Sequence, residues 1–293
     1  AGRSIFERGF CGTNRKNLPA RRTPVPVNPL WITSRWPSDS SEGIDPNRSF
    51  DVNWEPGANP GSPRTSTYAG AEPWLAPEAK AMAELAAALR PQISVHYHGP
   101  GGYSLIPGNW RDGSPPLERP LHLEVAREFA RLSNPEFSNG LPEQVGTCGF
   151  ASFQGAAHDW CYQEFYGVHV LAEGFSGHVP KDDQLLPVAG SAAIAELVET
   201  NLQALFRLGE RVTGAGLELH VRDAAGRPLV ARVEIRGALD PHCKPQFTDP
   251  VHGAYRRILP PGDDYGVVIR CDGYADVRRE GVSVPADRPA RLT

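Results

Sequence analysis

The stretch Ile93-Ser94-Val95-His96-Tyr97-His98 is the part of the sequence from which the fold can be read outward. Its composition predicts a short strand, and the glycine-rich run Gly99–Gly102 that follows it predicts a tight turn. A helix is expected before the strand, from about Pro77 to Leu89, because Pro77 and Glu78 open a run of Ala, Glu, Leu and Met.

Three further elements are expected in the same part of the chain. A second helix covers roughly Leu117–Leu132, and a short buried strand at Val168–Leu171 leads to Glu173. A long amphipathic helix from about Ala192 to Val212 carries apolar residues at helical spacing. Residues 17–65 are rich in Pro, Ser, Arg and Trp without lasting periodicity, and we expect them to form long loops.

The character of the sequence changes after Gly214. Short strands separated by Gly, Pro and Asp turns are expected at Leu217–Val221, Val230–Ile235, Gly253–Ile258 and Tyr265–Ile269. This pattern is typical of a β-sandwich of about 80 residues. The sequence therefore predicts two domains, one of residues 1–212 and one of residues 213–293.

Length, composition and net charge limit the number of domains and the classes of partner that the sequence allows. The 293 residues suit two domains of roughly 100–200 residues each. The net charge is −4 and there is no basic block, so the sequence gives no sign of nucleic-acid binding. No apolar run approaches the roughly 20 residues that a membrane helix needs. The five cysteines are odd in number and lack metal-like spacing, so they define no disulfide framework.

Four separated motifs occur in one order along the chain. They are Asn14-Arg15-Lys16-Asn17; Asp45-Pro46-Asn47-Arg48-Ser49-Phe50; His98-Gly99, with Pro107 nine residues on from His98; and Gly155-Ala156-Ala157-His158-Asp159-Trp160, with Glu173 fourteen residues after Asp159. Each motif alone is a weak signal, whereas the ordered set is a strong one.

This ordered set resembles the zinc metallocarboxypeptidases. The C-terminal segments Gly226-Arg227-Pro228-Leu229 and Leu259-Pro260-Pro261-Gly262 are similar to the regulatory (N/E) branch of that family. The resemblance covers nearly the whole chain. It implies a mixed-sheet α/β/α carboxypeptidase domain, followed by a small all-β transthyretin-like sandwich.

The resemblance also implies a role for each motif in hydrolysing the C-terminal peptide bond of peptides or proteins. Asn47 and Arg48 would hold the free carboxylate, which a planar guanidinium can bind bidentately. Arg15 would stabilise the oxyanion of the transition state. Glu173 would be the general base that takes a proton from zinc-bound water. His98 would be a ligand of the single zinc ion.

Each charged residue has a plain structural alternative. Asn47 and Arg48 could form a turn with a surface salt bridge, and Arg15 could be a solvated charge in the basic segment 14–22. Glu173 could cap a strand. Taken with the whole motif set, the catalytic role is favoured for Glu173.

The zinc-ligating histidine also has a rival. His96 projects to the same face of the strand as His98, because residues two apart in a strand share a face. The His-Gly step and the spacing to Pro107 favour His98. A lone histidine is otherwise more often a hydrogen-bonded core residue than a ligand.

Two residues are expected to shape the substrate pocket. His158 occupies the position that usually lies at the base of the pocket for the C-terminal side chain. It carries no fixed negative charge, which argues against a preference for Lys or Arg and favours an acidic, polar or aromatic side chain; a backbone hydrogen bond is an equal alternative for it. The family's substrate-covering tyrosine has no counterpart before Asp159, and Phe153 could cover the substrate only by packing.

The family pattern fails at the other two zinc ligands, a His and a Glu three residues apart that precede the Arg-Lys-Asn motif. No histidine of the 293 residues has Glu at i+3. The nearest match, His220 with Asp223, lies in a strand, where positions i and i+3 face opposite sides. A catalytic zinc needs about three protein ligands. We therefore expect this chain to lack an N-terminal segment and to be inactive by itself.

The expected partners are peptide or protein C-termini, with no nucleic acid and no membrane span. The family resemblance implies export in bacteria and therefore a secreted or periplasmic protein, with a cytoplasmic location as the alternative. A second hypothesis is a degenerate relative that binds C-terminal carboxylates without hydrolysis, or a chain that acts as an interaction module.

Overall fold

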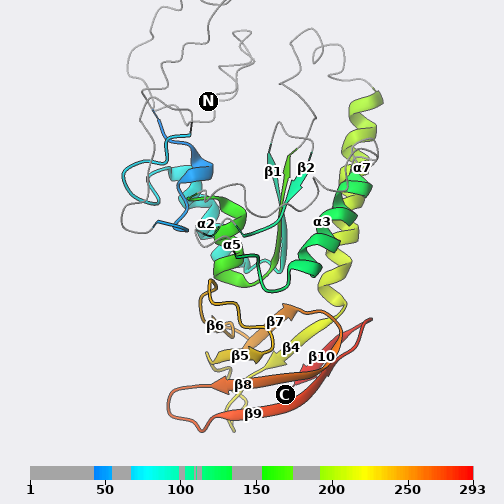
Figure 1. Ribbon diagram of the computed structural model, residues 1–293. Helices are drawn as coiled ribbons and strands as arrows, with labels where there is room; N and C mark the ends of the chain where they lie inside the picture. Colours follow the sequence, from blue (N-terminus) through cyan, green and yellow to red (C-terminus); the bar gives the residue numbers. More distant parts are fainter. Residues whose placement is uncertain are drawn as a thin grey trace, which may run out of the picture.

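A computed structural model describes residues 43–54, 67–98, 103–108, 110, 114–133, 154–173 and 192–292. Figure 1 shows helices around a small sheet, with further β-sheets below them. The elements of the first part are η2 (Pro46–Arg48), α2 (Pro77–Leu89), β1 (Ile93–His98), β2 (Tyr103–Leu105), α3 (Arg119–Ser133), α5 (Ala157–Phe165), β3 (Val168–Glu173) and α7 (Ala192–Glu210).

The sheet of the first part is mixed, as the sequence predicts. Its strand order is β1-β3-β2, with β1 parallel and β2 antiparallel to β3. The register pairs Ile93 with Val168 at one end and His98 with Glu173 at the other. Helices α3 and α7 lie on one side of this sheet and α5 on the other (Figure 1). The predicted α/β class is therefore confirmed.

The two faces of the sheet differ in chemistry, because neighbouring residues of a strand point to opposite sides. Val168 and Val170 are buried in the apolar core beneath α3 and α7, with Ile93 and Val95 packed against it. The alternate positions, among them Ser94, His96 and His169, face α5. The α5 face is thus the polar one.

An aromatic cluster fixes η2 and α5 side by side. Phe50 and Trp74 each pack against Trp160, with ring centroids 5.6 Å and 5.4 Å from it. Phe50 and Trp160 belong to one core cluster, which also includes Ala79 of α2, and the partly buried Trp74 packs against it. This apolar cluster therefore holds the segment that follows the Asn47-Arg48 turn against α5.

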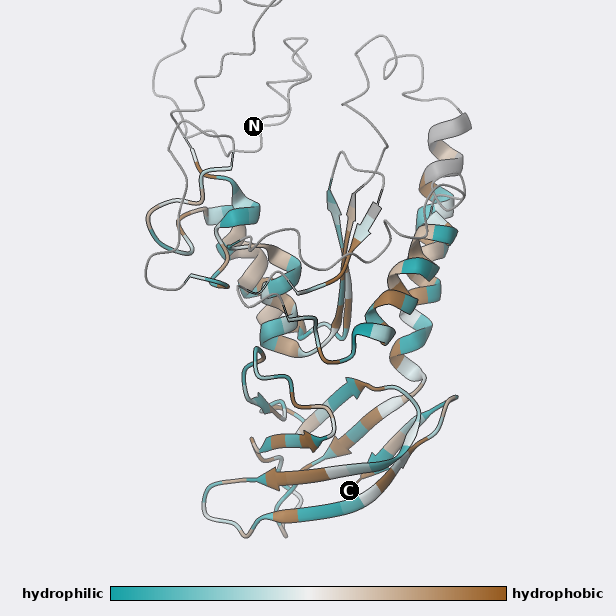
Figure 2. Ribbon diagram, viewed as in Figure 1, coloured by the Kyte–Doolittle hydropathy of each residue, from teal (hydrophilic) through white to brown (hydrophobic). Residues whose placement is uncertain are grey.

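The C-terminal part is all β, as expected. After η3 (Arg211–Thr213), its strands are β4 (Gly216–His220), β5 (Arg232–Arg236), β6 (Gln246–Phe247), β7 (Ala254–Ile258), β8 (Gly262–Arg270), β9 (Val277–Val284) and β10 (Pro289–Leu292). They form two sheets, β10-β4-β7 and β6-β5-β8-β9. These strands carry both hydrophobic and hydrophilic residues (Figure 2), and the sheets share one apolar core that includes Leu217, Ile235 and Val267. The division into domains at residue 213 stays a prediction.

A buried polar seam joins the C-terminal sheets to the helices. Arg257 of β7 forms an ion pair with Glu118 and donates a 2.6 Å hydrogen bond from Nη1 to the carbonyl of Ala238. Its guanidinium lies 3.8 Å from the ring centre of Tyr166. The Tyr162 hydroxyl donates to Asp240 Oδ2 at 2.8 Å. Glu118 and Arg257 thus pair with each other, and the carboxylate of Asp240 accepts hydrogen bonds, which offsets the cost of burying these charges.

Among the described residues, none of the helices is long and apolar enough to span a bilayer.

Candidate functional site

Two motif positions that are 75 residues apart meet at one edge of the sheet. His98 and Glu173 are register partners at the carboxyl ends of the parallel strands β1 and β3. Tyr103 of β2 pairs with Glu173 from the other side. The carboxyl ends of parallel strands are where α/β proteins commonly place ligands. The strand pairing therefore brings together the expected zinc ligand and the expected general base.

The Asn47-Arg48 turn is held from both sides. The backbone N–H of Asn47 donates to Asp45 Oδ1 at 3.0 Å, and Asn47 Oδ1 accepts from the backbone N–H of Ala157 at 3.0 Å. Arg48 Nη1 donates to the Asn47 carbonyl at 2.7 Å. Asn47 and Arg48 both keep part of their surface exposed. Asn47 is thus a positioning residue for the first turn of α5 as well as a candidate ligand-binding residue.

Gly155 is the point where the second and fourth motifs touch. Its φ of +71° is a left-handed conformation, and a Cβ atom there would lie 2.0 Å from the carbonyl oxygen of Arg48. Gly155 also donates to the Val52 carbonyl at 2.9 Å and accepts from Phe50 N–H at 3.3 Å. Only glycine combines this backbone conformation with so close an approach. The glycine of the motif is explained by this contact.

Asp159 joins the third motif to the fourth. Its side chain is fully buried, and Oδ1 accepts a 3.1 Å hydrogen bond from the backbone N–H of Gly108, the residue after Pro107. Sequence reasoning assigns Asp159 no role beyond its place in the motif, and only its spacing to Glu173 points to it. The structure shows that its carboxylate anchors the segment that follows β2.

Three histidines lie close together between the sheet and α5: His96 of β1, His169 of β3 and His158 of α5. Ser94 Oγ is hydrogen-bonded to His96 Nε2 at 2.8 Å and to His169 Nδ1 at 2.6 Å. The His96 ring centre lies 6.4 Å from that of His169 and 6.5 Å from that of His158. Burial lowers the pKa of His96 to about 3 and lowers the pKa of His169 well below its usual value. These imidazoles are neutral at pH 7, with a lone pair on one nitrogen each.

The remaining predicted site residues divide into two kinds. Arg15 and Phe153 lie outside the described residues. His158 is buried, and its Nε2 lies 3.7 Å from Asp159 Oδ1, too far for a hydrogen bond. Its role at the base of a substrate pocket stays a prediction. His96, the rival of His98, shares its strand face with Ser94 and is hydrogen-bonded in the interior.

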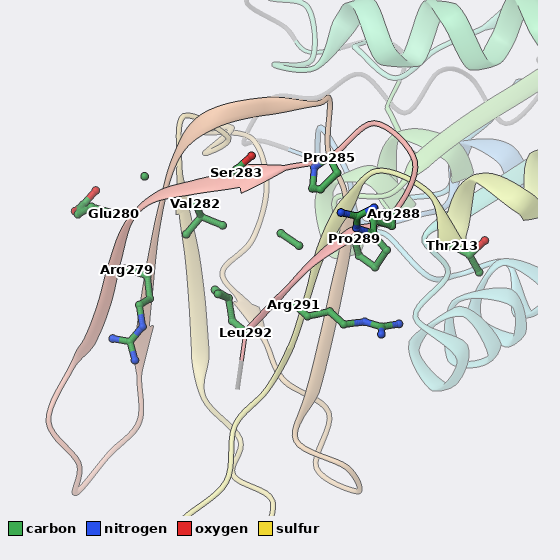
Figure 3. A pocket seen from close by; sticks show the side chains of 12 residues that line it. Thr213, Arg279, Glu280, Val282, Ser283, Pro285, Arg288, Pro289, Arg291 and Leu292 are labelled. Carbon is green, nitrogen blue, oxygen red and sulfur yellow. The ribbon is translucent and has the colours of Figure 1, made fainter.

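A separate groove lies on the C-terminal strands (Figure 3). It has a volume of about 780 Å³ and is lined by residues of β9, β10 and the segment between them, including Arg279, Val282 and Arg288. None of its lining residues belongs to the four motifs. The groove does not contribute to the arrangement around His98.

A model of one known protein family matches residues 19–193, and its description is zinc carboxypeptidase. The match covers more than half of the 293 residues and includes Asn47, Arg48, His98 and Glu173. The chain belongs to the zinc carboxypeptidase family. Arg15 lies outside the part that the family model matches. A search of curated proteins found no match.

Three solved structures resemble the chain over part of its length. Carboxypeptidase A from Helicoverpa armigera is 21% identical with a TM-score of 0.41, covering 55% of this chain and 42% of its own. Thrombin activatable fibrinolysis inhibitor is 20% identical with a TM-score of 0.39, covering 54% and 36%. The bovine inhibitor, in complex with tick carboxypeptidase inhibitor, is 18% identical with a TM-score of 0.43, covering 66% and 62%. The chain spans less than two thirds of the length of each of these structures.

The family implies zinc, and the described side chains do not complete a site for it at His98. A catalytic zinc takes three protein ligands. Among the described side chains, the group of metal-binding type is His96, Cys161 and His169, without His98. The sequence also contains no His-x-x-Glu pair. The described residues around His98 thus do not complete the family's metal site.

Proposed function

We propose that this chain binds the C-terminal carboxylate of peptides at Asn47 and Arg48 and supplies the general base, Glu173, of a zinc carboxypeptidase. The observation that carries the binding part of the proposal is the partly exposed Asn47-Arg48 turn, held by hydrogen bonds to Asp45 and Ala157. The pairing of His98 with Glu173 at the carboxyl ends of β1 and β3 supports the part on the general base. Family membership of the matched segment 19–193 supports it.

Arg48 is the residue proposed to bind the substrate carboxylate. A guanidinium presents a planar fork that matches the two oxygens of a carboxylate. Arg48 is partly exposed, and Asp45, Asn47 and Gly155 fix the backbone on which it stands. A fixed clamp loses little freedom on binding, so binding energy is retained. The free C-terminus of a peptide is the ligand that this chemistry selects.

Glu173 is proposed to hold and move the proton in the reaction. A carboxylate within hydrogen-bond reach of water can take a proton and pass it to the leaving amine. Hydrolysis also needs the zinc ligands that the 293 residues do not supply beside His98. We therefore propose that hydrolysis belongs to the whole gene product, with binding as the part that this chain performs.

A second candidate function rests on one specific observation. No His-x-x-Glu pair and no tyrosine seven or eight residues before Asp159 occur in this sequence. A protein that binds C-terminal carboxylates without hydrolysing the peptide would need neither feature.

The whole gene product, assayed for release of the C-terminal residue from a peptide, tests the proposal. We expect release that a chelator stops and that Glu173→Gln lowers by at least about 100-fold, the range that one general base contributes. Peptide binding should survive that change. Glu84→Gln, an exposed change on α2, is the matched control and should leave release unaltered. Full release by Glu173→Gln would refute the assignment of the base, and carboxylate-dependent binding without release would favour the second candidate.

A further inference from the structure

We propose that His96, Cys161 and His169 form a binding site for a transition-metal ion of the zinc type, buried on the α5 face of the sheet. The three side chains offer one ligand atom each, and these atoms all lie within 4.8 Å of one another. They come from three separate elements, β1, α5 and β3. The site contains none of the residues assigned to carboxylate binding, and it does not rest on the proposed function.

The chemistry of the three ligands selects the class of ion. Imidazole nitrogen and thiolate sulfur are ligands that suit Zn²⁺ and Co²⁺, whereas Mg²⁺ and Ca²⁺ prefer oxygen. Cys161 is one of three free cysteines among the described residues, the others being Cys243 and Cys271. A free thiol beside two neutral imidazoles is a combination that an apolar core does not require.

The positions of the two imidazoles converge on one point. His96 Nε2 and His169 Nδ1 are both hydrogen-bonded to Ser94 Oγ. Zinc bonds of about 2.0–2.3 Å place ligand atoms roughly 3.3–3.8 Å apart in a tetrahedral site. Binding would therefore draw the ligand atoms together by about 1 Å. The Ser94 hydroxyl has one hydrogen, so one of the two imidazoles donates to Oγ and would move that proton to its other ring nitrogen in order to bind the metal through the same atom. The Ser94 hydroxyl then lies beside the ion and can supply a fourth, oxygen ligand.

The proposed metal site is largely shielded from solvent, but one of its ligands is partly accessible. Cys161 and His169 are buried, whereas His96 keeps part of its surface exposed. Burial raises the pKa of the Cys161 thiol to about 12, so the sulfur carries a proton at pH 7 until a metal displaces it. Binding of one divalent ion should then release one proton to solvent, because both histidines are already neutral.

The consequence of an occupied site is a fixed geometry for the neighbouring residues. The ion would tie β1, which ends at His98, to β3, which ends at Glu173. It would also tie both strands to α5, whose first residue holds the side chain of Asn47. We therefore expect the ion to stabilise the fold and to fix the positions of these residues rather than to take part in a reaction.

Titration of the purified chain with Co²⁺ tests the site through an optical signal. We expect a thiolate-to-cobalt charge-transfer band in the near ultraviolet, one proton released per ion, and a melting temperature that rises with cobalt concentration by mass action. Cys161→Ser, a nearly isosteric change, should abolish the band and weaken binding by more than about 100-fold. His96→Asn should weaken binding while keeping the cysteine.

Three of the other four cysteines provide the matched control, and Cys243 is kept because its Sγ is hydrogen-bonded to the Tyr162 carbonyl. The triple variant Cys11→Ser/Cys148→Ser/Cys271→Ser should retain the band, the proton release and the stabilisation. A wild-type chain without a charge-transfer band at saturating cobalt would overturn the proposal and show that the cluster is a hydrogen-bonded one. A band that persists in Cys161→Ser would overturn it as well. If His96→Asn fails to fold, the spectrum of Cys161→Ser decides alone.

Discussion

The two parts of the molecule bury different kinds of side chain. The α/β part buries imidazoles and a carboxylate around α5, among them His122, His158, His169 and Asp159. The core of the C-terminal sheets consists of apolar and aromatic residues such as Leu219 and Val233. Polar groups inside a protein cost free energy unless they are paired. The buried histidines of the described residues lie in the α/β part, and His122 of α3 reaches α5 through a ring contact of 5.0 Å with Tyr162. The apolar core of the C-terminal sheets contains none of them.

The seam between the parts should give the largest effect. Arg257→Met leaves Glu118 buried without its partner, which should lower the free energy of unfolding by about 3–5 kcal/mol. Arg256→Met, one residue away, removes a partly buried pair with Glu218 and a 3.2 Å hydrogen bond to the Gly214 carbonyl, and should cost about 1–2 kcal/mol. Urea unfolding measures both. Equal losses would show that the seam is not held by the buried charge.

The second-largest loss of stability is expected at the contact between Gly155 and the Arg48 carbonyl. Gly155→Ala places a Cβ against the Arg48 carbonyl in a left-handed conformation, and we expect a loss of about 3 kcal/mol together with weaker peptide binding. Gly226→Ala has a φ of +80° but open space around the new atom, so it should cost only about 1 kcal/mol. Thermal unfolding of both variants checks this difference. Similar losses would mean that the close approach to Arg48 does not matter.

A smaller loss of folding stability is expected when the pH is lowered. Burial lowers the pKa of His122 to about 3, below the ordinary value of 6.5 that it regains on unfolding. Between these values the unfolded chain binds more protons, so stability falls as the pH drops below 6.5. At pH 5 the loss from this residue should be about 2 kcal/mol relative to pH 7. His122→Phe should make the pH dependence shallower without abolishing it, because burial lowers the pKa of His96 and His169 as well. A slope unchanged from wild type would contradict the assignment.

A matched control exists for that measurement. His252 is exposed on the C-terminal part, so His252→Phe should keep the wild-type pH dependence of unfolding. A flattened slope in this variant instead would place the titrating group outside the α/β interior.

Local signals in the sequence predict part of the fold well. The helix expected at Pro77–Leu89 and the strand expected at Ile93–His98 have those bounds in the structure, since a proline at the helix start and glycines after the strand mark their ends. The helix expected to reach Val212 ends at Glu210, where η3 takes over. Elements with a clear apolar period or a clear terminator are therefore predictable.

Other elements carry no such signal. Helix α5 buries each residue from Ala157 to Tyr162, so it shows no amphipathic period. Strand β9 is largely exposed at Val277–Gly281 and lacks the alternation of a half-buried strand. Strand β10 pairs with β4, which lies some 70 residues earlier in the chain. These elements depend on long-range pairing, which a local pattern does not contain.

The candidate site shows the same limit. The ordered motifs predict the family, and the family model confirms it. They do not reveal that Ser94 and His169 are register partners on one face, because that depends on how β1 and β3 align. The cluster with Cys161 follows only from that alignment and from the packing of α5.

The central claim, that Asn47 and Arg48 bind a peptide C-terminus, is tested most directly by calorimetry with two peptides. One is N-acetylated with a free C-terminal carboxylate, and the other is its C-terminal amide. We predict that the chain binds the free acid at least tenfold more tightly, and that Arg48→Ala removes this preference while the exposed Arg131→Ala keeps it. Equal binding of the two peptides, or a preference that survives Arg48→Ala, would contradict the account.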